Sequence, residues 1–379
     1  MNRKQAWNVI TLFCIMIFGF TVATFLKPDA QHSESENRDL AQMPKVTLES
    51  VLSGDFEADY EKYLTDQFVG RDGWIGLKTG VERATGRRES KDIYFAKDDY
   101  LIEKHTGSFA TDTARQNVRV LGQFAKQYQD RFESGHMTFM VIPNAVDILS
   151  DKLPPFASPY DEEQYLKELE AVLPEGMWFD AAAVLREHKE EEIYYRTDHH
   201  WTTLAAFYTY QAWAGQQGGV VPSQDDYEIE TVTDSFEGTI QSKLGIRTEQ
   251  DSIELYQHKE DIFYTVEKNG NPEITYSLYD YPSLRTKSKY NVFFGGNHAL
   301  VKIATRQNTG KRILVVKDSY AHCFVPFLLD GYDQIDMLDI RYYNQKLSEL
   351  IAEGEYTDFL FLYNASGFAE DTGISRLIY

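Results

Sequence analysis

Apolar runs and amphipathic segments alternate along most of the chain and predict an α/β fold. Short apolar runs bounded by turn residues are typical of strands buried on both faces of a parallel sheet. The segments between them repeat apolar residues at helical spacing and predict the covering helices. We expect strands at residues 137–142, 312–317, 333–340 and 357–363, and helices at residues 111–131, 161–173, 181–191, 202–216, 322–329 and 343–352. The pattern indicates a flavodoxin-like three-layer α/β/α sheet.

Two regions depart from this alternation. Residues 47–88 have apolar positions at helical spacing, and residues 28–45 before them are polar, as in a linker. Residues 220–300 alternate between apolar and polar and contain turn residues such as Asn269-Gly270, which predicts a β-rich insertion. The expected organisation is a cytoplasmic tail (1–6), a membrane span (7–26), a linker with a membrane-proximal helical segment (27–100) and one large domain (101–379).

The N-terminal segment predicts a membrane anchor. Residues 7–26 hold no charged side chain, and an uncharged helix of this length spans about 30 Å of hydrocarbon. Arg3 and Lys4 precede the run and predict that the N-terminus stays in the cytoplasm, with the rest of the chain outside. A cleaved signal peptide is the alternative, because Ala23 and Ala30 lie near the boundary. The run is long for a signal peptide, which favours an uncleaved anchor.

Charge and composition narrow the class of partner. Three of the 38 basic residues lie within the first 27 positions, so the remainder carries 35 basic and 59 acidic residues, a net charge of −24. Such a body repels nucleic acid and disfavours a strongly anionic glycan as ligand. The 25 tyrosines suit ring-shaped polar ligands such as sugars, although most should lie in the core. Cys323 is the one cysteine outside the anchor, where Cys14 lies. We expect Cys323 to be a buried, inert thiol rather than a nucleophile.

A first candidate for chemistry is the segment from Asp198 to Trp201. In an extended or turn segment, Asp198 and His200 project to the same side, so the carboxylate can accept a hydrogen bond from Nδ1 of the imidazole. That support lets a histidine act as a general base. The other interpretations are two surface histidines, or an aspartate that caps the helix beginning near Thr202.

A second candidate is Ser319, which follows the apolar strand at 312–317 directly. Ligands and catalytic groups gather at the carboxyl ends of parallel strands. A serine at such a turn exposes its hydroxyl, and nearby backbone N–H groups can stabilise an oxyanion. An ordinary helix N-cap explains the residue equally well. Arg341 and Asn364 end the neighbouring expected strands, so they should face the same crevice, and the side-chain amide of Asn364 is an oxyanion donor candidate.

Other residues complete the candidate site. Gly296 and Asn297 belong to a glycine-rich loop that permits close backbone approach to a substrate, or forms a simple turn. A metal site is a weaker hypothesis, because adjacent histidines lack the spacing that places two ligands on one helical face, although His298 and His322 could join them through the fold. We expect no metal and no cofactor.

The pair of motifs resembles a known family. Asp-His-His-Trp at 198–201, followed by Lys-Asp-Ser-Tyr-Ala at 317–321 after an apolar strand, resembles the DHHW protein family, which is similar to the periplasmic proteins of alginate O-acetylation. Further matching segments are ENRDLA (36–41), DQFVGRD (66–72), FEGT (236–239), FFGGN (293–297) and DIRYY (339–343). The resemblance implies a circularly permuted SGNH-hydrolase-like domain. Lys317 stands where many SGNH hydrolases have glycine.

The resemblance also implies a function and roles for individual residues. Ser319 would be the nucleophile, His200 the base and Asp198 its orienting partner. Asn364 would take the oxyanion role, and Arg341 stands where the family of SGNH hydrolases usually offers glycine. Oxyanion and substrate contacts are expected from Asn364, Asn297, Gly296, Arg341, Tyr320 and Trp201.

The reaction implied is O-acetylation of a cell-surface or secreted polysaccharide, with acetyl groups supplied by a multi-pass membrane acyltransferase. A polysaccharide acetyl esterase with the same triad is the enzymatic alternative, since only the acceptor differs. A catalytically silent, membrane-anchored scaffold or glycan-binding protein is the non-enzymatic alternative.

Overall fold

The computed structural model describes residues 2–33, 38–132, 135–271 and 273–378. Contacts divide the chain into two compact units. The N-terminal unit comprises Met1–Arg87 with Gln241–Arg247, and the sheet unit comprises Arg88–Ile240 with Thr248–Tyr379. The domain limits expected at residues 27 and 101 stay predictions. Glu36 and Asn37 of the ENRDLA segment lie outside the described residues.

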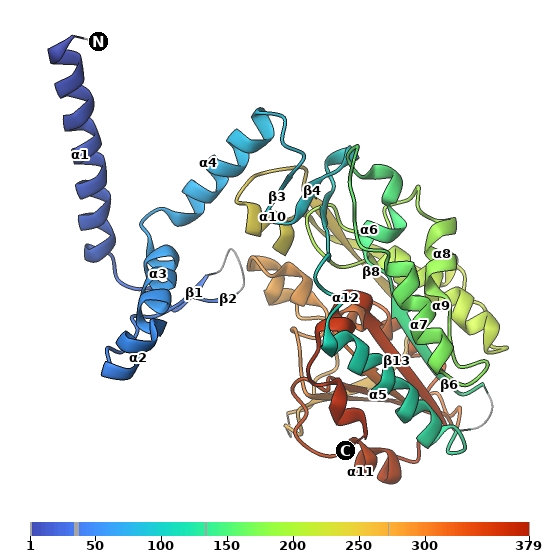
Figure 1. Ribbon diagram of the computed structural model, residues 1–379. Helices are drawn as coiled ribbons and strands as arrows, with labels where there is room; N and C mark the ends of the chain where they lie inside the picture. Colours follow the sequence, from blue (N-terminus) through green and yellow to red (C-terminus); the bar gives the residue numbers. More distant parts are fainter. Residues whose placement is uncertain (1, 34–37, 133–134, 272, 379) are drawn as a thin grey trace. The chain divides into compact units, whose positions relative to one another are not determined.

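A six-stranded sheet forms the centre of the sheet unit (Figure 1). The strand order is β6-β13-β11-β12-β10-β9. The first four strands are parallel to one another, β10 is antiparallel to β12, and β9 is antiparallel to β10. Every residue of β6 and β13 is buried, which explains why both sequences are largely apolar. The strands are β6 (Met137–Ile142), β9 (Tyr264–Lys268), β10 (Leu300–Thr305), β11 (Arg312–Lys317), β12 (Gln334–Leu338) and β13 (Asp358–Asn364).

Helices cover both faces of this sheet. On β6, the ring of Phe139 packs against Phe124 of α5, whereas the hydroxyl of Thr138 accepts a hydrogen bond from Trp213 of α9. Successive strand residues point to opposite faces, so α5 and α9 lie on opposite sides. The predicted three-layer α/β/α class is confirmed. The helices are α5 (Asp112–Tyr128), α6 (Ala145–Ile148), α7 (Glu162–Val172), α8 (Ala181–Glu187), α9 (Thr203–Gln216), α11 (Leu347–Glu353) and α12 (Ala365–Glu370).

The β-rich segment at 220–300 divides between two sheets. Strands β7 (Tyr227–Phe236) and β8 (Asp251–His258) pair with each other as an irregular antiparallel ribbon. Strand β9 instead joins the central sheet through β10, which extends it with antiparallel strands. An alternating pattern predicts strands but does not say which sheet receives them. A further small sheet consists of β3 (Glu89–Ser90), β4 (Ile93–Phe95) and β5 (Leu101–Glu103).

Two predicted helices differ in the structure. The helix expected over 322–329 is replaced by two 3₁₀ turns, η6 (Ser319–His322) and η7 (Val325–Leu328). Pro326 lacks the N–H group that a continuous α-helix requires there. The helix expected from residue 343 begins only at Leu347, because the N–H groups of Tyr342 and Tyr343 both bond to the carbonyl of Asp339 in a turn.

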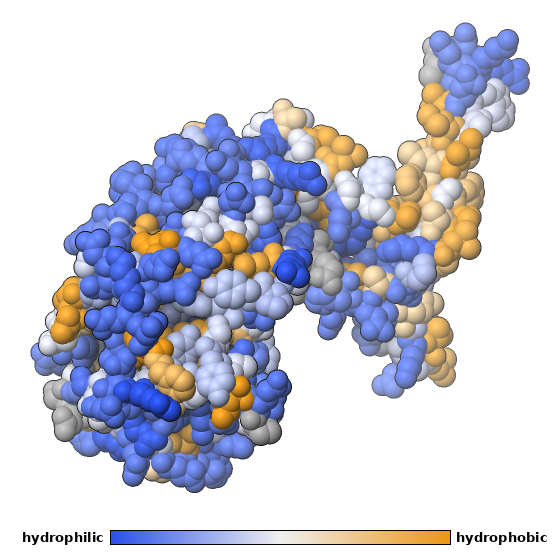
Figure 2. Space-filling view, turned by 180° about the vertical axis from the view of Figure 1, so that it is seen from behind, coloured by the Kyte–Doolittle hydropathy of each residue, from blue (hydrophilic) through white to orange (hydrophobic). Residues whose placement is uncertain are grey.

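The N-terminal unit is helical. Helix α1 (Arg3–Leu26) has no buried residue, and its apolar surface is orange in Figure 2. Within the described part of the chain, α1 is the one helix long and apolar enough to cross a membrane, by length and composition. The other elements are β1 (His32–Ser33), β2 (Arg38–Asp39), α2 (Leu48–Ser53), α3 (Asp55–Gln67) and α4 (Arg71–Ala84), and α10 (Thr239–Leu244) is shared by the two units.

Candidate active site

The two predicted motifs meet at the carboxyl edge of the parallel strands. Ser319 opens the turn η6 directly after β11, with Asp318 as its N-cap. His200 lies in the loop before α9, and this loop is closed by a hydrogen bond from the N–H of Tyr195 to the carbonyl of His200, 3.3 Å long. The indole Nε1 of Trp201 donates to the carbonyl of Tyr320 at 2.9 Å and so joins this loop to η6.

Asp198, His200 and Ser319 form a continuous hydrogen-bonded chain. His200 Nδ1 lies 2.6 Å from Asp198 Oδ1, and His200 Nε2 lies 2.8 Å from Ser319 Oγ. A carboxylate only accepts, so Nδ1 carries the proton and Nε2 accepts from the serine hydroxyl. Asp198 and His200 are buried, whereas Ser319 is partly exposed. The sequence prediction that Asp198 and His200 project together is confirmed, and the hydroxyl that they face remains within reach of a substrate.

The carboxylate of Asp198 is held in its charged form. Burial alone would raise its pKa, but the electrostatic interactions with His199 and His200 and the hydrogen bonds from His200 and Thr239 keep that pKa well below its usual range. Thr239 donates to Oδ2 with its N–H at 2.8 Å and its hydroxyl at 3.0 Å. Asp198 can therefore orient the imidazole of His200 and stabilise its protonated form.

Two residues that the sequence did not predict complete the surroundings of His200. The ring of Tyr290 stacks on the imidazole, with centroids 3.8 Å apart and planes 15° apart, and its hydroxyl donates to the carbonyl of Ser319 at 3.3 Å. Thr239 was noted only as part of the FEGT segment. Gly238, beside it, has no room for a side chain, because a Cβ there would lie 2.3 Å from Cβ of Asp198. No local signal distinguishes Tyr290 from the other tyrosines.

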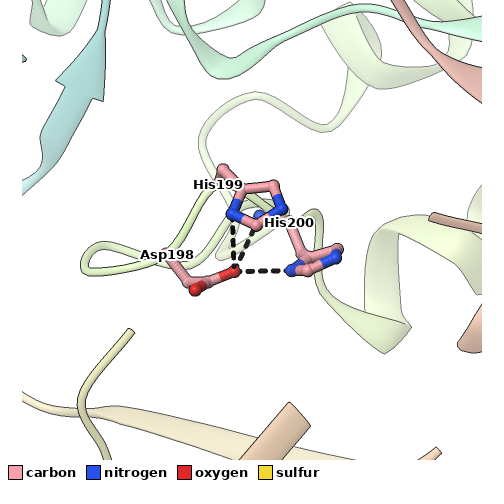
Figure 3. A group of neighbouring side chains, drawn as sticks. All are labelled: Asp198, His199 and His200. Atoms are coloured by element: carbon pink, nitrogen blue, oxygen red, sulfur yellow. Dashed lines mark hydrogen bonds and ion pairs between the residues drawn. The ribbon is translucent and has the colours of Figure 1, made fainter. Parts of the chain in front are cut away.

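His199 does not join the chain of hydrogen bonds to Ser319. Its Nδ1 lies 2.9 Å from the hydroxyl of Thr239. The same Nδ1 lies 3.5 Å from Asp198 Oδ1 (Figure 3). Asp198, His199 and His200 each offer an atom that could bind a metal ion, all within 4.8 Å of one another. The 2.6 Å between Asp198 Oδ1 and His200 Nδ1 is a direct hydrogen bond with no space for an ion between the two atoms. The geometry favours the triad over the metal hypothesis.

Trp201 and Tyr320, expected near the substrate, lie in the core. Both are almost completely buried, with exposed fractions of 0% and 1%. Their rings stack at 5.7 Å, and the hydroxyl of Tyr320 donates to the carbonyl of His199. The structure places them beneath the site, where they hold the loop of His200 against the turn of Ser319.

Asn364 ends β13 beside Ser319, as the sequence predicted, but its side chain has other partners. Its Nδ2 donates to Asn144 Oδ1 at 2.8 Å, and its Oδ1 accepts from the N–H of Gly367 as the N-cap of α12. Its backbone N–H donates to Asp318 Oδ2 at 2.9 Å. An oxyanion role for this amide would require it to leave Asn144.

Arg341 and the glycine-rich loop have no hydrogen bond to the triad among the described residues. The guanidinium of Arg341 binds both carboxylate oxygens of Asp339, at 2.8 and 2.7 Å. Gly296 has a φ of 97° and Asn297 is exposed. In the described parts of the chain, no hydrogen bond joins Gly296 or Asn297 to Ser319, His200 or Asp198.

A buried group of charges lies beneath the Ser319 turn. Lys317 Nζ lies 3.3 Å from Asp339 Oδ2 and donates to His322 Nε2 at 2.8 Å. Burial lowers the pKa of Lys317 and lowers that of His322 well below its usual value, so His322 is a neutral acceptor. Cys323 is fully buried, and burial raises the pKa of its thiol to about 12, which fits the predicted inert thiol.

The fold and the arrangement at the strand ends define an SGNH-hydrolase-like α/β protein. The chain belongs to the DHHW protein family, whose family model matches residues 108–338. This confirms the resemblance inferred from the two motifs. No curated protein sequence matches the chain.

Solved structures share the fold. A DHHW family protein from Eubacterium siraeum DSM 15702 is 23% identical, with a TM-score of 0.61 over 76% of this chain and 95% of that chain. PatB1 of Bacillus cereus is 20% identical, with a TM-score of 0.60 over 73% of this chain and 97% of that chain. The O-acetyltransferase domain of Pseudomonas putida AlgJ is 12% identical, with a lower TM-score of 0.45 over 75% of this chain and 98% of that chain. The first two similarities establish the fold.

Proposed function

We propose that this protein is an extracytoplasmic O-acetyltransferase that modifies a cell-surface or secreted polysaccharide through an acetyl-serine intermediate at Ser319. The observation that carries the proposal is the hydrogen-bonded chain from Ser319 through His200 to Asp198. This arrangement supplies a nucleophile, a base and a group that orients the base.

In the first step, the acetyl group moves to the enzyme. His200 Nε2 takes the hydroxyl proton of Ser319 while Oγ bonds to the carbonyl carbon of the donor. The tetrahedral intermediate then collapses, and the departing group takes the proton from His200. Asp198 stabilises the imidazolium between these two transfers.

The oxyanion of the intermediate requires N–H donors close to Ser319. The backbone N–H of Ser319 has no hydrogen-bond acceptor among the residues that the structure describes, and it lies at the first position of η6. We assign it as the first donor. Asn364, the Gly296–Asn297 loop and Arg341 remain proposed contributors, and Asn364 would have to exchange its bond to Asn144.

In the second step, the acetyl group moves to the acceptor. His200 takes a proton from a sugar hydroxyl, whose oxygen bonds to the acetyl carbon, and Ser319 recovers its hydroxyl as the ester leaves. Water in place of the sugar would give an esterase. Family membership and the sequence resemblance to O-acetylation proteins favour transfer over hydrolysis; the triad itself serves both.

The proposed setting is the outer side of a cell membrane. Helix α1 fits a single-pass anchor by length and composition. The basic residues before it orient the sheet unit outward. The acetyl donor is then a multi-pass membrane acyltransferase that carries acetyl groups across the bilayer.

A sulfonyl fluoride tests the nucleophile, because such reagents bond to activated hydroxyls. A structure of Bacillus cereus PatB1 is described with a sulfonyl adduct. We expect the full chain in detergent to gain one sulfonyl group on Ser319, and Ser319→Ala and His200→Ala to gain none. Ser348→Ala, in α11, is the matched control and should label as the wild type does. Labelling of Ser319→Ala at the wild-type rate would remove this serine from the proposal.

A second experiment separates transfer from hydrolysis. The protein is supplied with an activated acetyl ester, with and without an oligosaccharide acceptor. A transferase gives acetylated oligosaccharide at the expense of free acetate, whereas an esterase gives acetate in unchanged yield.

A further inference from the structure

A second cavity in the sheet unit lies outside the triad. It has a volume of about 240 Å³ and forms where the end of β8, the start of β9, the segment 276–279 and η7 meet. Pockets for drug-sized ligands usually measure about 300–1,000 Å³, so this one suits a single ring or a small charged group.

Tyrosine rings dominate the walls of this cavity. Tyr256, Tyr264, Tyr276 and Tyr279 line it. Tyr276 is 68% exposed, which leaves its ring face open to a ligand. Aromatic faces carry negative charge density and attract cations as well as the C–H faces of sugar rings.

The lining of the cavity carries carboxylates, and a cation close to it is Arg306, 4.2 Å above the ring of Phe263, which in turn lies 6.1 Å from the ring of Tyr276. Glu260 and Asp261 line it, and both are exposed. Of the described residues in its lining, none is lysine or arginine. Lys259 lies between lining residues but donates its ammonium to the carbonyl of Asp225 at 2.7 Å. His258 Nε2 lies 3.3 Å from the carbonyl of Pro326. Carboxylates beside open tyrosine rings match a positively charged ligand and repel an anionic one.

A row of aromatic rings joins the cavity to the triad. Tyr279 contacts Phe293, with centroids 6.1 Å apart, Phe293 contacts Tyr290 at 5.2 Å, and Tyr290 stacks on His200 at 3.8 Å. The cavity and Ser319 therefore belong to one packed body.

We propose that this cavity binds an organic ammonium group, of the kind found in a sugar with a free amine or in choline. Tyr276 receives the cation on its ring, and Glu260 and Asp261 supply the opposite charge. Binding of an ammonium group at the cavity is independent of the proposed acetyl transfer. If that transfer takes place, we further infer that the acetyl acceptor is a polymer bearing amines, and this inference rests on the proposed function.

Calorimetry on the full chain in detergent tests the site with a glucosamine tetramer, an N-acetylglucosamine tetramer and choline. We expect the glucosamine tetramer to bind at least about tenfold more tightly than the neutral tetramer, and more weakly as salt rises. Binding of choline as well identifies the ammonium group as sufficient, whereas binding of glucosamine alone identifies an amino sugar; both support the site. Equal binding of the two tetramers, or no binding of glucosamine and choline, would overturn the proposal.

Variants locate the binding. Tyr276→Ala and the double variant Glu260→Gln/Asp261→Asn should each weaken binding of the glucosamine tetramer about tenfold or more. The control Glu228→Gln/Asp234→Asn makes the same charge change on exposed residues of β7 and should bind as the wild type does. If the cavity variants bind the glucosamine tetramer as tightly as the wild type does, the ligand binds elsewhere. Sulfonyl labelling of Ser319 is measured in the same variants and should be unchanged, so failure of the site and failure of the proposed reaction are distinguished.

Discussion

Asp198 binds its neighbours through both carboxylate oxygens, and the two oxygens have different tasks. Oδ1 holds Nδ1 of His200, whereas Oδ2 accepts the N–H and hydroxyl of Thr239. The two hydrogen bonds from Thr239 hold the carboxylate in the orientation that the bond to His200 requires. An asparagine offers one acceptor and one donor, so it cannot satisfy both sides.

We predict that Asp198→Asn folds but loses most of its reactivity. The rate of Ser319 acylation by an activated ester should fall about 10⁴-fold, the size of effect known for this change in another serine triad. Stopped-flow measurement of the released leaving group gives the rate, and circular dichroism checks the fold. A loss below tenfold would mean that His200 needs no orienting carboxylate.

Tyr290 makes two contacts that the sequence did not reveal: its ring stacks on His200, and its hydroxyl donates to the carbonyl of Ser319. We predict that Tyr290→Phe, which keeps the stacked ring, acylates within about threefold of the wild type. Tyr290→Leu removes the ring from His200 and should slow acylation about tenfold, because an aromatic face stabilises the imidazolium. The same rate in the two variants, measured as above, would show that the ring contact with His200 has no effect on the reaction.

The triad could be predicted because its members lie in two short motifs, with Asp198 and His200 two positions apart. The roles of Tyr290 and Thr239 could not, since their contacts join segments that are distant in the chain; Tyr290 has no local pattern, and the FEGT segment indicates family membership but not the bond from Thr239 to Asp198. Trp201 and Tyr320 were predicted to contact the substrate, but their side chains are buried in the core. Their adjacency to His200 and Ser319 was visible in the sequence, but the direction of their side chains depends on packing.

At the scale of elements, the parallel strands bring the site together. Val316 of β11 pairs with Phe361 of β13 and Leu338 of β12, so the three strands end along one edge. Largely apolar runs made these strands predictable. The 3₁₀ turns after Ser319 were not predictable from periodicity, because burial on all sides hides the helical pattern and Pro326 acts only as a local break.

The loop of His200 depends on a close approach by the segment before α10. We predict that Gly238→Ala displaces Asp198, since the new Cβ would lie 2.5 Å from the carbonyl oxygen of Thr197. The free energy of unfolding should fall by about 1–3 kcal/mol, and acylation should be lost with it. Gly107→Ala, at a position with open space, is the control for the thermal midpoint. Wild-type stability and rate in Gly238→Ala would contradict the observed contact.

Helix α7 places a buried acid next to the strand ends. Glu162 accepts from the N–H and the side-chain amide of Asn144 at 2.7 and 3.0 Å, and Asn144 in turn binds Asn364. Burial raises the pKa of Glu162 to about 8 from an ordinary value of 4.5, although the bonds from Asn144 oppose the rise. The folded protein therefore keeps a proton that the unfolded chain releases between these two pH values.

Stability should accordingly fall as pH rises through that window. The slope contributed by Glu162 reaches at most about 1.4 kcal/mol per pH unit between pH 4.5 and 8. We predict that Glu162→Gln flattens the dependence, measured from urea unfolding at pH 5, 6.5 and 8. Glu170→Gln, on the exposed face of α7, should keep the wild-type slope. Parallel curves for the wild type and Glu162→Gln would contradict the raised pKa.

At the scale of the whole molecule, the chain combines an apolar N-terminal helix with an acidic sheet unit. The uncharged run made the apolar N-terminal helix predictable, and the family motifs made the fold class predictable. The sequence did not predict that the β-rich segment divides between two sheets, because tertiary packing determines how distant strands pair. The tyrosine-lined cavity arises from the same pairing of distant segments.

The most direct test of the central claim is mass spectrometry of the full chain after brief exposure to an activated acetyl ester and an acid quench. The account predicts one added acetyl group on the peptide that contains Ser319, absent from Ser319→Ala and from His200→Ala. An acetyl group that stays in the Ser319→Ala variant, or no adduct together with no hydrolysis of the ester by the wild type, would contradict the acetyl-serine mechanism.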